Sequence, residues 1–137
     1  MTEKLSPTGE GVAPLCQGPD PKTRAPKRPT PAGACDTHAH VFGPAAKYPY
    51  PPERSYTPPD CPLDDYIRMR DVLGLTRAVI VQASIQGTDN APTLDAIAEG
   101  GDGFRGVAVV APDIGEAELQ RLHDGGMRGV RMTTLVR

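Results

Sequence analysis

Apolar positions after residue 33 fall into two alternating patterns. Short continuous apolar runs have the length of strands, and between them apolar side chains recur every three or four residues, as on one helical face. In chain order, the pattern predicts a strand over 34–41, a helix that begins at Pro62 and is closed by Gly74, a strand over 77–82, a helix capped by Asp89 or Asn90 and ended by Gly100-Gly101, a strand over 104–110, a helix over 113–125 and a strand over 126–132. Strands that alternate with helices predict parallel pairing, in either an open doubly wound sheet or a β/α barrel.

The first 33 residues have a different composition. Prolines recur throughout this segment, and large apolar side chains are nearly absent. Such a segment cannot bury enough apolar surface to offset its ordering entropy. We therefore predict a disordered proline-rich tail over 1–33 and a folded domain over 34–137.

Two histidines distinguish the two architectures. The turn after the first strand lacks the Gly-x-Gly-x-x-Gly pattern of a dinucleotide-binding sheet, and it carries His38 and His40 instead. Residues two apart on a strand point the same way, so the two rings should lie side by side. Such a pair can bind a metal or donate two hydrogen bonds to one carbonyl oxygen.

Polar residues also follow the later strands, among them Gln82, Ser84 and Arg131. In a β/α barrel these strand ends form the rim on which the active site assembles. A complete barrel needs about 250 residues, and the domain expected over 34–137 is less than half as long. We therefore predict the N-terminal half of a (β/α)8 barrel, with about four strands and three helices.

Composition and charge limit the classes of binding partner and the cellular compartments that the sequence supports. A net charge of −2 and a pI near 5.9 give no electrostatic case for binding nucleic acid or an anionic membrane. No apolar stretch approaches the ~18–20 residues of a membrane span, and residues 1–10 lack the apolar core of a signal peptide. Three widely spaced cysteines argue against a disulfide framework or a structural zinc site. These features favour a cytoplasmic protein.

Several stretches of the domain resemble the amidohydrolase-related family, and within it the 2-pyrone-4,6-dicarboxylate lactonase group. They are CDTHAHVFGP (35–44), RSYTPPDCPLDDY (54–66), RAVIVQASIQGTDN (77–90), FRGVAVV (104–110) and LHDGGMRGVR (122–131). The resemblance implies a β/α barrel that hydrolyses a cyclic ester of a dicarboxylic acid in aromatic-acid catabolism, acting on a small-molecule lactone without a cofactor.

The resemblance also assigns roles to residues. It implies that His38 and His40 surround the scissile carbonyl as catalytic residues. The positions that match substrate-holding ones are Tyr56, Ser84, Arg131 and Arg137. Ser84 can equally cap its local turn. The water-activating aspartate and a third histidine of the family would lie beyond residue 137.

Two alternatives stay open. In the wider superfamily the same histidine pair holds a divalent metal, so a zinc-dependent amidohydrolase or decarboxylase with His38 and His40 as ligands is one of them. The other is a non-catalytic fragment. A half barrel leaves two open sheet edges, so this chain would function as a homo-oligomer or with a complementing C-terminal half.

Overall fold

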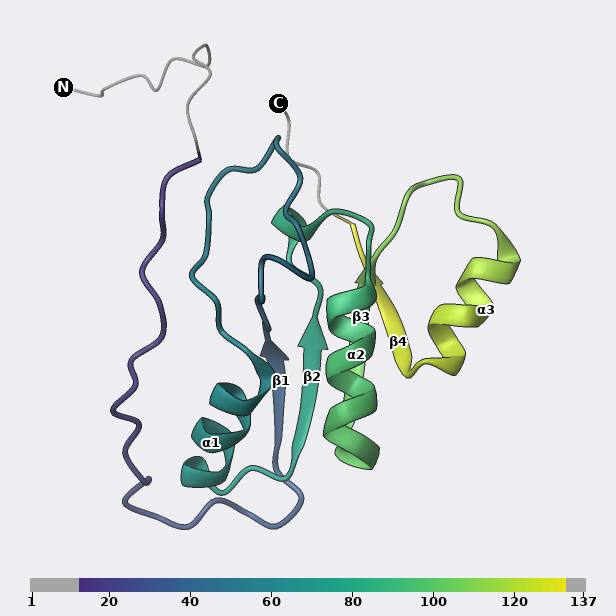
Figure 1. Ribbon diagram of the computed structural model, residues 1–137. Coiled ribbons are helices and arrows are strands. Elements are labelled where there is room, and N and C mark those ends of the chain that lie inside the picture. The colour runs from purple at the N-terminus through teal and green to yellow at the C-terminus, as the bar shows by residue number, and fades with distance from the viewer. Residues whose placement is uncertain (1–12, 133–137) are drawn as a thin grey trace, which may run out of the picture.

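Four parallel strands and three α-helices alternate along residues 13–132, the part of the chain that the computed structural model describes (Figure 1). The elements are β1 (Cys35–Ala39), α1 (Leu63–Leu73), β2 (Arg77–Val81), α2 (Ala91–Gly100), β3 (Phe104–Val109), α3 (Glu116–Asp124) and β4 (Met127–Arg131). The strands pair in sequence order, β1-β2-β3-β4. The order of elements predicted from the hydrophobic pattern is therefore confirmed.

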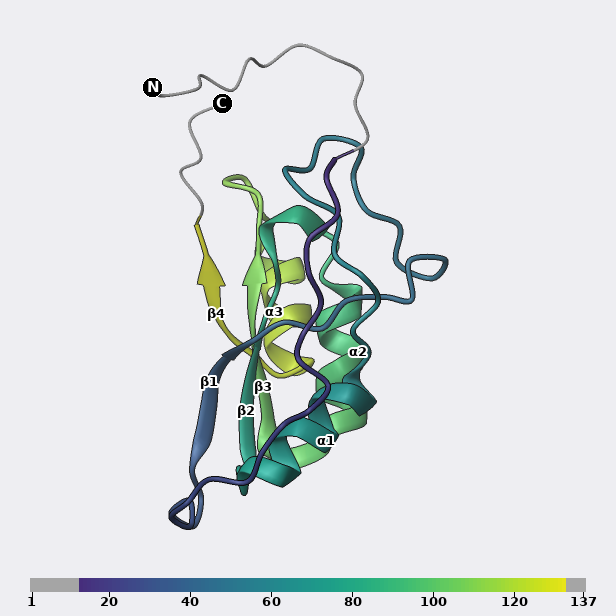
Figure 2. The same ribbon diagram turned by 90° about the vertical axis from the view of Figure 1, so that its left-hand side faces the viewer.

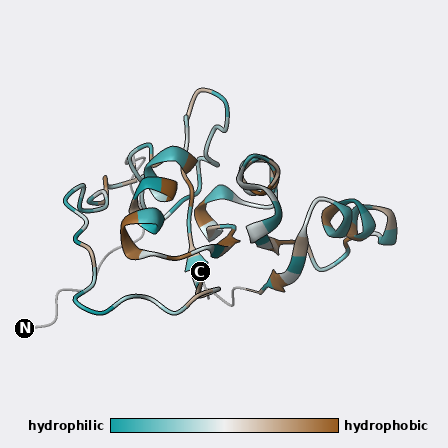
Figure 3. Ribbon diagram, turned by 90° about the horizontal axis from the view of Figure 1, so that it is seen from below, coloured by the Kyte–Doolittle hydropathy of each residue, from teal (hydrophilic) through white to brown (hydrophobic). Residues whose placement is uncertain are grey.

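The helices lie on one face of the sheet (Figure 2). Each helical ribbon carries hydrophobic and hydrophilic stretches, as expected for helices with one buried face (Figure 3). Ile80 and Phe104 are fully buried in the core. Gly106 of β3 allows α2 to approach closely, because a Cβ at this position would lie 2.6 Å from Ile97 Cδ1.

Helix boundaries differ slightly from the predicted ones. Pro62 occupies the N-cap position of α1 rather than its first turn, and Gly74 closes the helix in the left-handed conformation with φ 71°. The third helix begins at Glu116 after Gly115, three residues later than predicted. Two short 3₁₀ turns, Ser84–Gln86 and Gly101–Gly103, were not predicted.

The described part of the proline-rich segment, residues 13–33, contains no regular helix or strand. It runs beside α1 from the carboxyl-end rim of the sheet to the foot of β1 (Figures 1 and 2). Leu15 forms an isolated bridge with Thr57, and the Thr30 hydroxyl donates to the carbonyl oxygen of Leu73. The disorder of residues 1–33 and the domain boundary after them stay predictions. Among residues 13–132, none of the helices has both the length and the apolarity needed to cross a membrane.

Candidate functional site

The carboxyl ends of all four strands lie at the same edge of the sheet, where the long loop 42–62 also lies (Figure 1). His38 is within β1 and His40 follows it directly. Ser84 opens the 3₁₀ turn after β2, and Arg131 is the last residue of β4. The sheet thus brings three of its strand ends, with Tyr56 on the loop, to the edge predicted to form the site.

A bulge in β1 shapes the histidine pair. Asp36 pairs with Ala78 and Ala39 pairs with Ile80. Between these two pairs β1 advances by three residues and β2 by two, so β1 contains one extra residue. The extra residue leaves His38 exposed, and His40 is half-buried beyond it. Their ring centroids lie 5.0 Å apart with the planes at 87°. The two rings therefore lie side by side in an edge-to-face arrangement, as the spacing predicted.

Asp36 holds the bulge in place. One carboxylate oxygen accepts the backbone N–H of His38 at 3.0 Å, and the other accepts the Tyr66 hydroxyl from α1 at 3.1 Å. Burial and the neighbouring carboxylate raise the pKa of Tyr66, so its phenol stays a donor. The backbone that carries His38 is thereby tied to the core helix.

The contacts of His40 define its protonation state. Its Nδ1 lies 2.7 Å from the carbonyl oxygen of Val81. Since a carbonyl oxygen only accepts, Nδ1 carries the proton. Burial lowers the pKa of His40 below 6.5, and although the Val81 carbonyl opposes this, His38 and Arg131 lower it further. A neutral His40 in this tautomer therefore has the lone pair of Nε2 available.

Arg131 comes from β4, which lies at the opposite edge of the sheet from the strand that carries the histidines. Its charge acts on both His40 and Tyr56. Burial raises the pKa of the Tyr56 phenol, Cys16 raises it further, and Arg131 opposes the rise. No carboxylate within residues 13–132 forms an ion pair with Arg131. A half-buried cation without an internal counterion is suited to bind an anionic ligand.

Of the two remaining predicted substrate-binding residues, Ser84 and Arg137, the structure describes only Ser84. The turn that Ser84 opens is closed by another side chain, because Gln86 Oε1 accepts the backbone N–H of Ala83 at 3.0 Å. The Ser84 hydroxyl has no hydrogen bond of its own in the described part of the chain. It is therefore available to a ligand. Arg137 lies outside the described residues.

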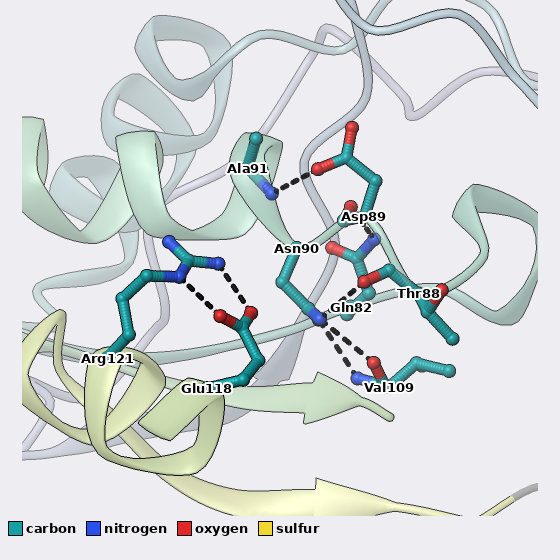
Figure 4. Close-up of polar contacts among 8 residues, drawn as sticks. All are labelled: Gln82, Thr88, Asp89, Asn90, Ala91, Val109, Glu118 and Arg121. Carbon is teal, nitrogen blue, oxygen red and sulfur yellow. Dashed lines mark hydrogen bonds and ion pairs between the residues drawn. The ribbon is translucent and has the colours of Figure 1, made fainter. Parts of the chain in front are cut away.

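Buried amides next to the site were not identified as such from the sequence. Gln82, expected on the rim, points inward with 0% exposure. Its Nε2 donates to the carbonyl oxygen of Asp89 at 2.8 Å, and its Oε1 accepts the Thr93 hydroxyl at 2.6 Å. Asn90 bonds both backbone groups of Val109 on β3 (Figure 4). These amides hold the 82–90 loop, and with it Ser84, against the sheet.

A sequence signal for this network did exist. The run 82–90 concentrates amide and hydroxyl side chains between a largely apolar strand and a helix. Polar side chains in such a tight connection need internal partners when they are buried. Figure 4 also shows the Glu118–Arg121 ion pair of α3, an exposed pair that takes no part in the amide network.

Few side chains that could bind a metal ion lie close together in the described part of the chain. No group of three or more His, Cys, Asp or Glu side chains able to hold a metal ion occurs within residues 13–132. His38 and His40 by themselves provide two nitrogen donors, whereas a zinc site uses at least three protein ligands.

Comparison with known proteins identifies relatives of this arrangement. The amidohydrolase family profile matches residues 35–137. The chain is 50% identical over 107 residues to the 2-pyrone-4,6-dicarboxylate hydrolase of Comamonas testosteroni, covering 78% of this chain and 35% of that protein. It is 41% identical over 120 residues to the 4-sulfomuconolactone hydrolase of Hydrogenophaga intermedia, covering 88% of this chain and 40% of that protein.

A solved structure agrees with these matches. The probable 2-pyrone-4,6-dicarboxylic acid hydrolase of Acinetobacter baumannii, crystallised with citric acid bound, superposes with a TM-score of 0.67 at 34% identity. The match covers 73% of this chain and 37% of that one. The chain thus spans well under half the length of the relatives it matches. The predicted fold class, a partial β/α barrel, is confirmed.

Proposed function

Because the chain belongs to the amidohydrolase family, we propose that it carries the carbonyl-facing and carboxylate-binding part of a hydrolase that opens the lactone ring of a pyrone dicarboxylate. The observation that carries the proposal is the half-buried Arg131, which has no counterion within residues 13–132 and acts on both His40 and Tyr56. A dicarboxylate lactone would supply the missing anion beside a polarisable carbonyl. The relatives that act on such lactones support this substrate class.

The residues divide the binding task by chemistry. The Arg131 guanidinium is a planar fork that fits one carboxylate. The Tyr56 phenol and the Ser84 hydroxyl add neutral donors. We propose that Arg137 contributes a second cation. Fixed donors of this kind hold the ring in one orientation, and orientation is a large part of catalytic advantage.

The histidines divide the carbonyl chemistry. A ring N–H of His38 can donate to the lactone carbonyl oxygen, while His40 in its Nδ1–H form accepts at Nε2. Hydrolysis adds water to the carbonyl carbon and breaks the ring C–O bond. The water proton needs a base, and the Asp36 carboxylate is already bonded to His38 and Tyr66. His40 Nε2 can accept a hydrogen bond from the attacking water, and we propose that the base that takes its proton, and returns it to the leaving ring oxygen, lies outside residues 13–132.

A zinc-dependent hydrolase or decarboxylase is the second candidate, and the tautomer of His40 favours it. Metal-bound histidines commonly donate their other ring N–H to a carbonyl oxygen, as His40 does to Val81. His38 and His40 fit two ligand positions of such a site, and the remaining ligands would come from outside residues 13–132. When bound, the metal would act as a Lewis acid on the substrate carbonyl.

Partner and compartment are proposed on separate grounds. The chain spans 35% and 40% of the two curated relatives, so we propose that a complete site forms in a homo-oligomer or with a complementing C-terminal half. The free state of Cys16, Cys35 and Cys61 fits the reducing cytoplasm.

Ligand binding tests the proposal directly. Titration calorimetry with 2-pyrone-4,6-dicarboxylate would compare wild type with Arg131→Met and with Arg128→Met. Arg128 is the matched control, because it is on the same strand and its guanidinium already donates to the carbonyl oxygens of His123 and Met127. Loss of a charge-assisted bond of about 1.5–3 kcal/mol predicts roughly ten- to hundredfold weaker binding for R131M alone. Absence of binding to wild type, or equal losses in both variants, would overturn it.

Hydrolysis with zinc and with a chelator separates the two candidates. Turnover that is unchanged by the chelator and abolished by His38→Ala supports the metal-free lactonase. Turnover that the chelator removes and zinc restores supports the metal-dependent enzyme.

A further inference from the structure

The segment 13–17, which we call the arm, pairs through its backbone with the loop that carries Tyr56. The N–H of Cys16 donates to the carbonyl oxygen of Thr57 at 2.9 Å, and the N–H of Thr57 donates to the carbonyl oxygen of Pro14 at 2.7 Å. The Thr57 hydroxyl donates to the carbonyl oxygen of Ala13 at 3.0 Å. Every hydrogen-bonding group of Thr57 is therefore engaged by the arm.

Arg54 holds the same loop from within. Its Nε donates to the Thr57 hydroxyl at 2.9 Å, and its Nη1 donates to the carbonyl oxygen of Pro51 at 3.0 Å. The guanidinium also lies over the Tyr50 ring, 5.9 Å from its centroid. The Thr57 hydroxyl thus joins the loop's internal contacts to the arm.

Tyr56 is the residue between these two tethers. The arm approaches it on one side, since Cys16 is close enough to raise the pKa of its phenol, and Arg131 acts on it as well. Fixing both backbone groups of the next residue restricts the backbone of Tyr56, from which its ring extends. The arm thus fixes the backbone that carries a phenol on which the Arg131 charge acts.

We infer that the arm is a positioning element of the site, which sets the direction of the Tyr56 phenol toward a carboxylate-bearing ligand beside Arg131. The inference rests on the proposed function for the identity of that ligand. The arm itself touches no reacting atom and acts through Tyr56. Its contacts are backbone bonds, which any extended segment can form. Pro14 suits the role, because it contributes only a carbonyl oxygen to the pairing.

A matched pair of substitutions at one position isolates the arm. Cys16→Pro removes the N–H that donates to Thr57, whereas Cys16→Ala removes only the thiol and keeps that N–H. Thr57→Val, which removes the hydroxyl that bonds both Ala13 of the arm and Arg54 of the loop, is a second variant. All three are made in the full 137-residue chain.

Ring resonances of Tyr56 in the ligand-free protein give a readout that does not depend on the proposed function. We expect C16P and T57V to shift them more than C16A does, because C16A removes a neighbouring thiol but keeps the backbone N–H that bonds Thr57. Amide hydrogen exchange at Thr57 should rise in C16P at the same time. Tyr56 shifts in C16P and T57V that are no larger than those in C16A would refute the inference, whatever the ligand does.

Binding of 2-pyrone-4,6-dicarboxylate then tests the route of the effect. We expect C16P and Tyr56→Phe each to weaken binding by about tenfold, and the double variant to be no weaker than Y56F alone. Losses that multiply in the double variant would show that the arm acts other than through Tyr56 and would overturn the inference. If wild type binds no ligand, the proposed function fails and the ring resonances alone decide the positioning role.

Discussion

Asn90 offers a sharp test of how the site is held together. Its side chain is 3% exposed and makes three hydrogen bonds. Nδ2 donates to the carbonyl oxygens of Thr88 at 2.9 Å and Val109 at 2.8 Å, and Oδ1 accepts the N–H of Val109 at 3.0 Å. Asn90→Ala therefore removes both partners of the last residue of β3.

The size of the effect follows from which groups are left without a partner. Thr88 is exposed, so its carbonyl oxygen regains water in the variant, whereas the two backbone groups of Val109 lie in a half-buried setting. Each unsatisfied buried group costs about 1–3 kcal/mol. Asn90 makes no side-chain cap of α2, so no capping loss is added. We expect N90A to lose about 2–4 kcal/mol of unfolding free energy.

Urea unfolding followed by circular dichroism measures this loss. Gln120→Ala is the control, because that exposed amide makes one hydrogen bond, to Asp124, and should cost less than about 0.5 kcal/mol. Asn90→Asp should cost at least as much as N90A at pH 7, because it sets a carboxylate against two carbonyl oxygens. A loss below about 1 kcal/mol in N90A would refute the view that this amide organises the loop.

Three further outcomes are expected. Because the pKa of His40 is lower in the folded protein, the unfolded chain binds a proton at this histidine more readily. The free energy of unfolding should therefore be constant above pH 6.5 as far as His40 is concerned, and it should fall as the pH drops from 6.5 toward the folded-state pKa. Urea titrations across this range should show a weaker pH dependence in His40→Gln. Gly106→Ala should cost about 1–3 kcal/mol through crowding against Ile97, and Gly129→Ala, whose added carbon would meet Val107 at 3.6 Å, should be close to neutral in thermal melts. Tyr66→Phe should cost about 1 kcal/mol and shift the amide resonance of His38, because Asp36 links the two; an unmoved His38 resonance would contradict that link.

The hydrophobic pattern was sufficient for the elements, because strand and helix lengths follow directly from where apolar side chains recur. Ile80 and Phe104, which lie within two of the predicted strands, are fully buried. The pattern could not show the β1 bulge. A bulge is a property of two paired strands, and Asp36 and Ala39 reveal it only through their partners on β2.

The arm escaped prediction for a different reason. Composition arguments weigh side-chain burial, and Leu15, the largest apolar residue of the arm, is 82% exposed. The arm contacts Thr57 through its own backbone groups, which composition does not record. Gln82 was predicted on the rim because its side chain is polar and follows a strand. The sequence alone does not show that this side chain turns inward and bonds Asp89 instead.

The histidine pair shows where the fold itself restricts the chemistry. Val81 is the last residue of β2, and its carbonyl oxygen accepts from His40 Nδ1. The neighbouring strand thus sets the tautomer of His40, independent of any substrate. In both candidate functions His40 then offers a lone pair at Nε2, and donation to a lactone carbonyl falls to His38 unless His40 is protonated. The choice between a water-handling and a metal-holding His40 therefore depends on which further ligands approach Nε2 from outside residues 13–132.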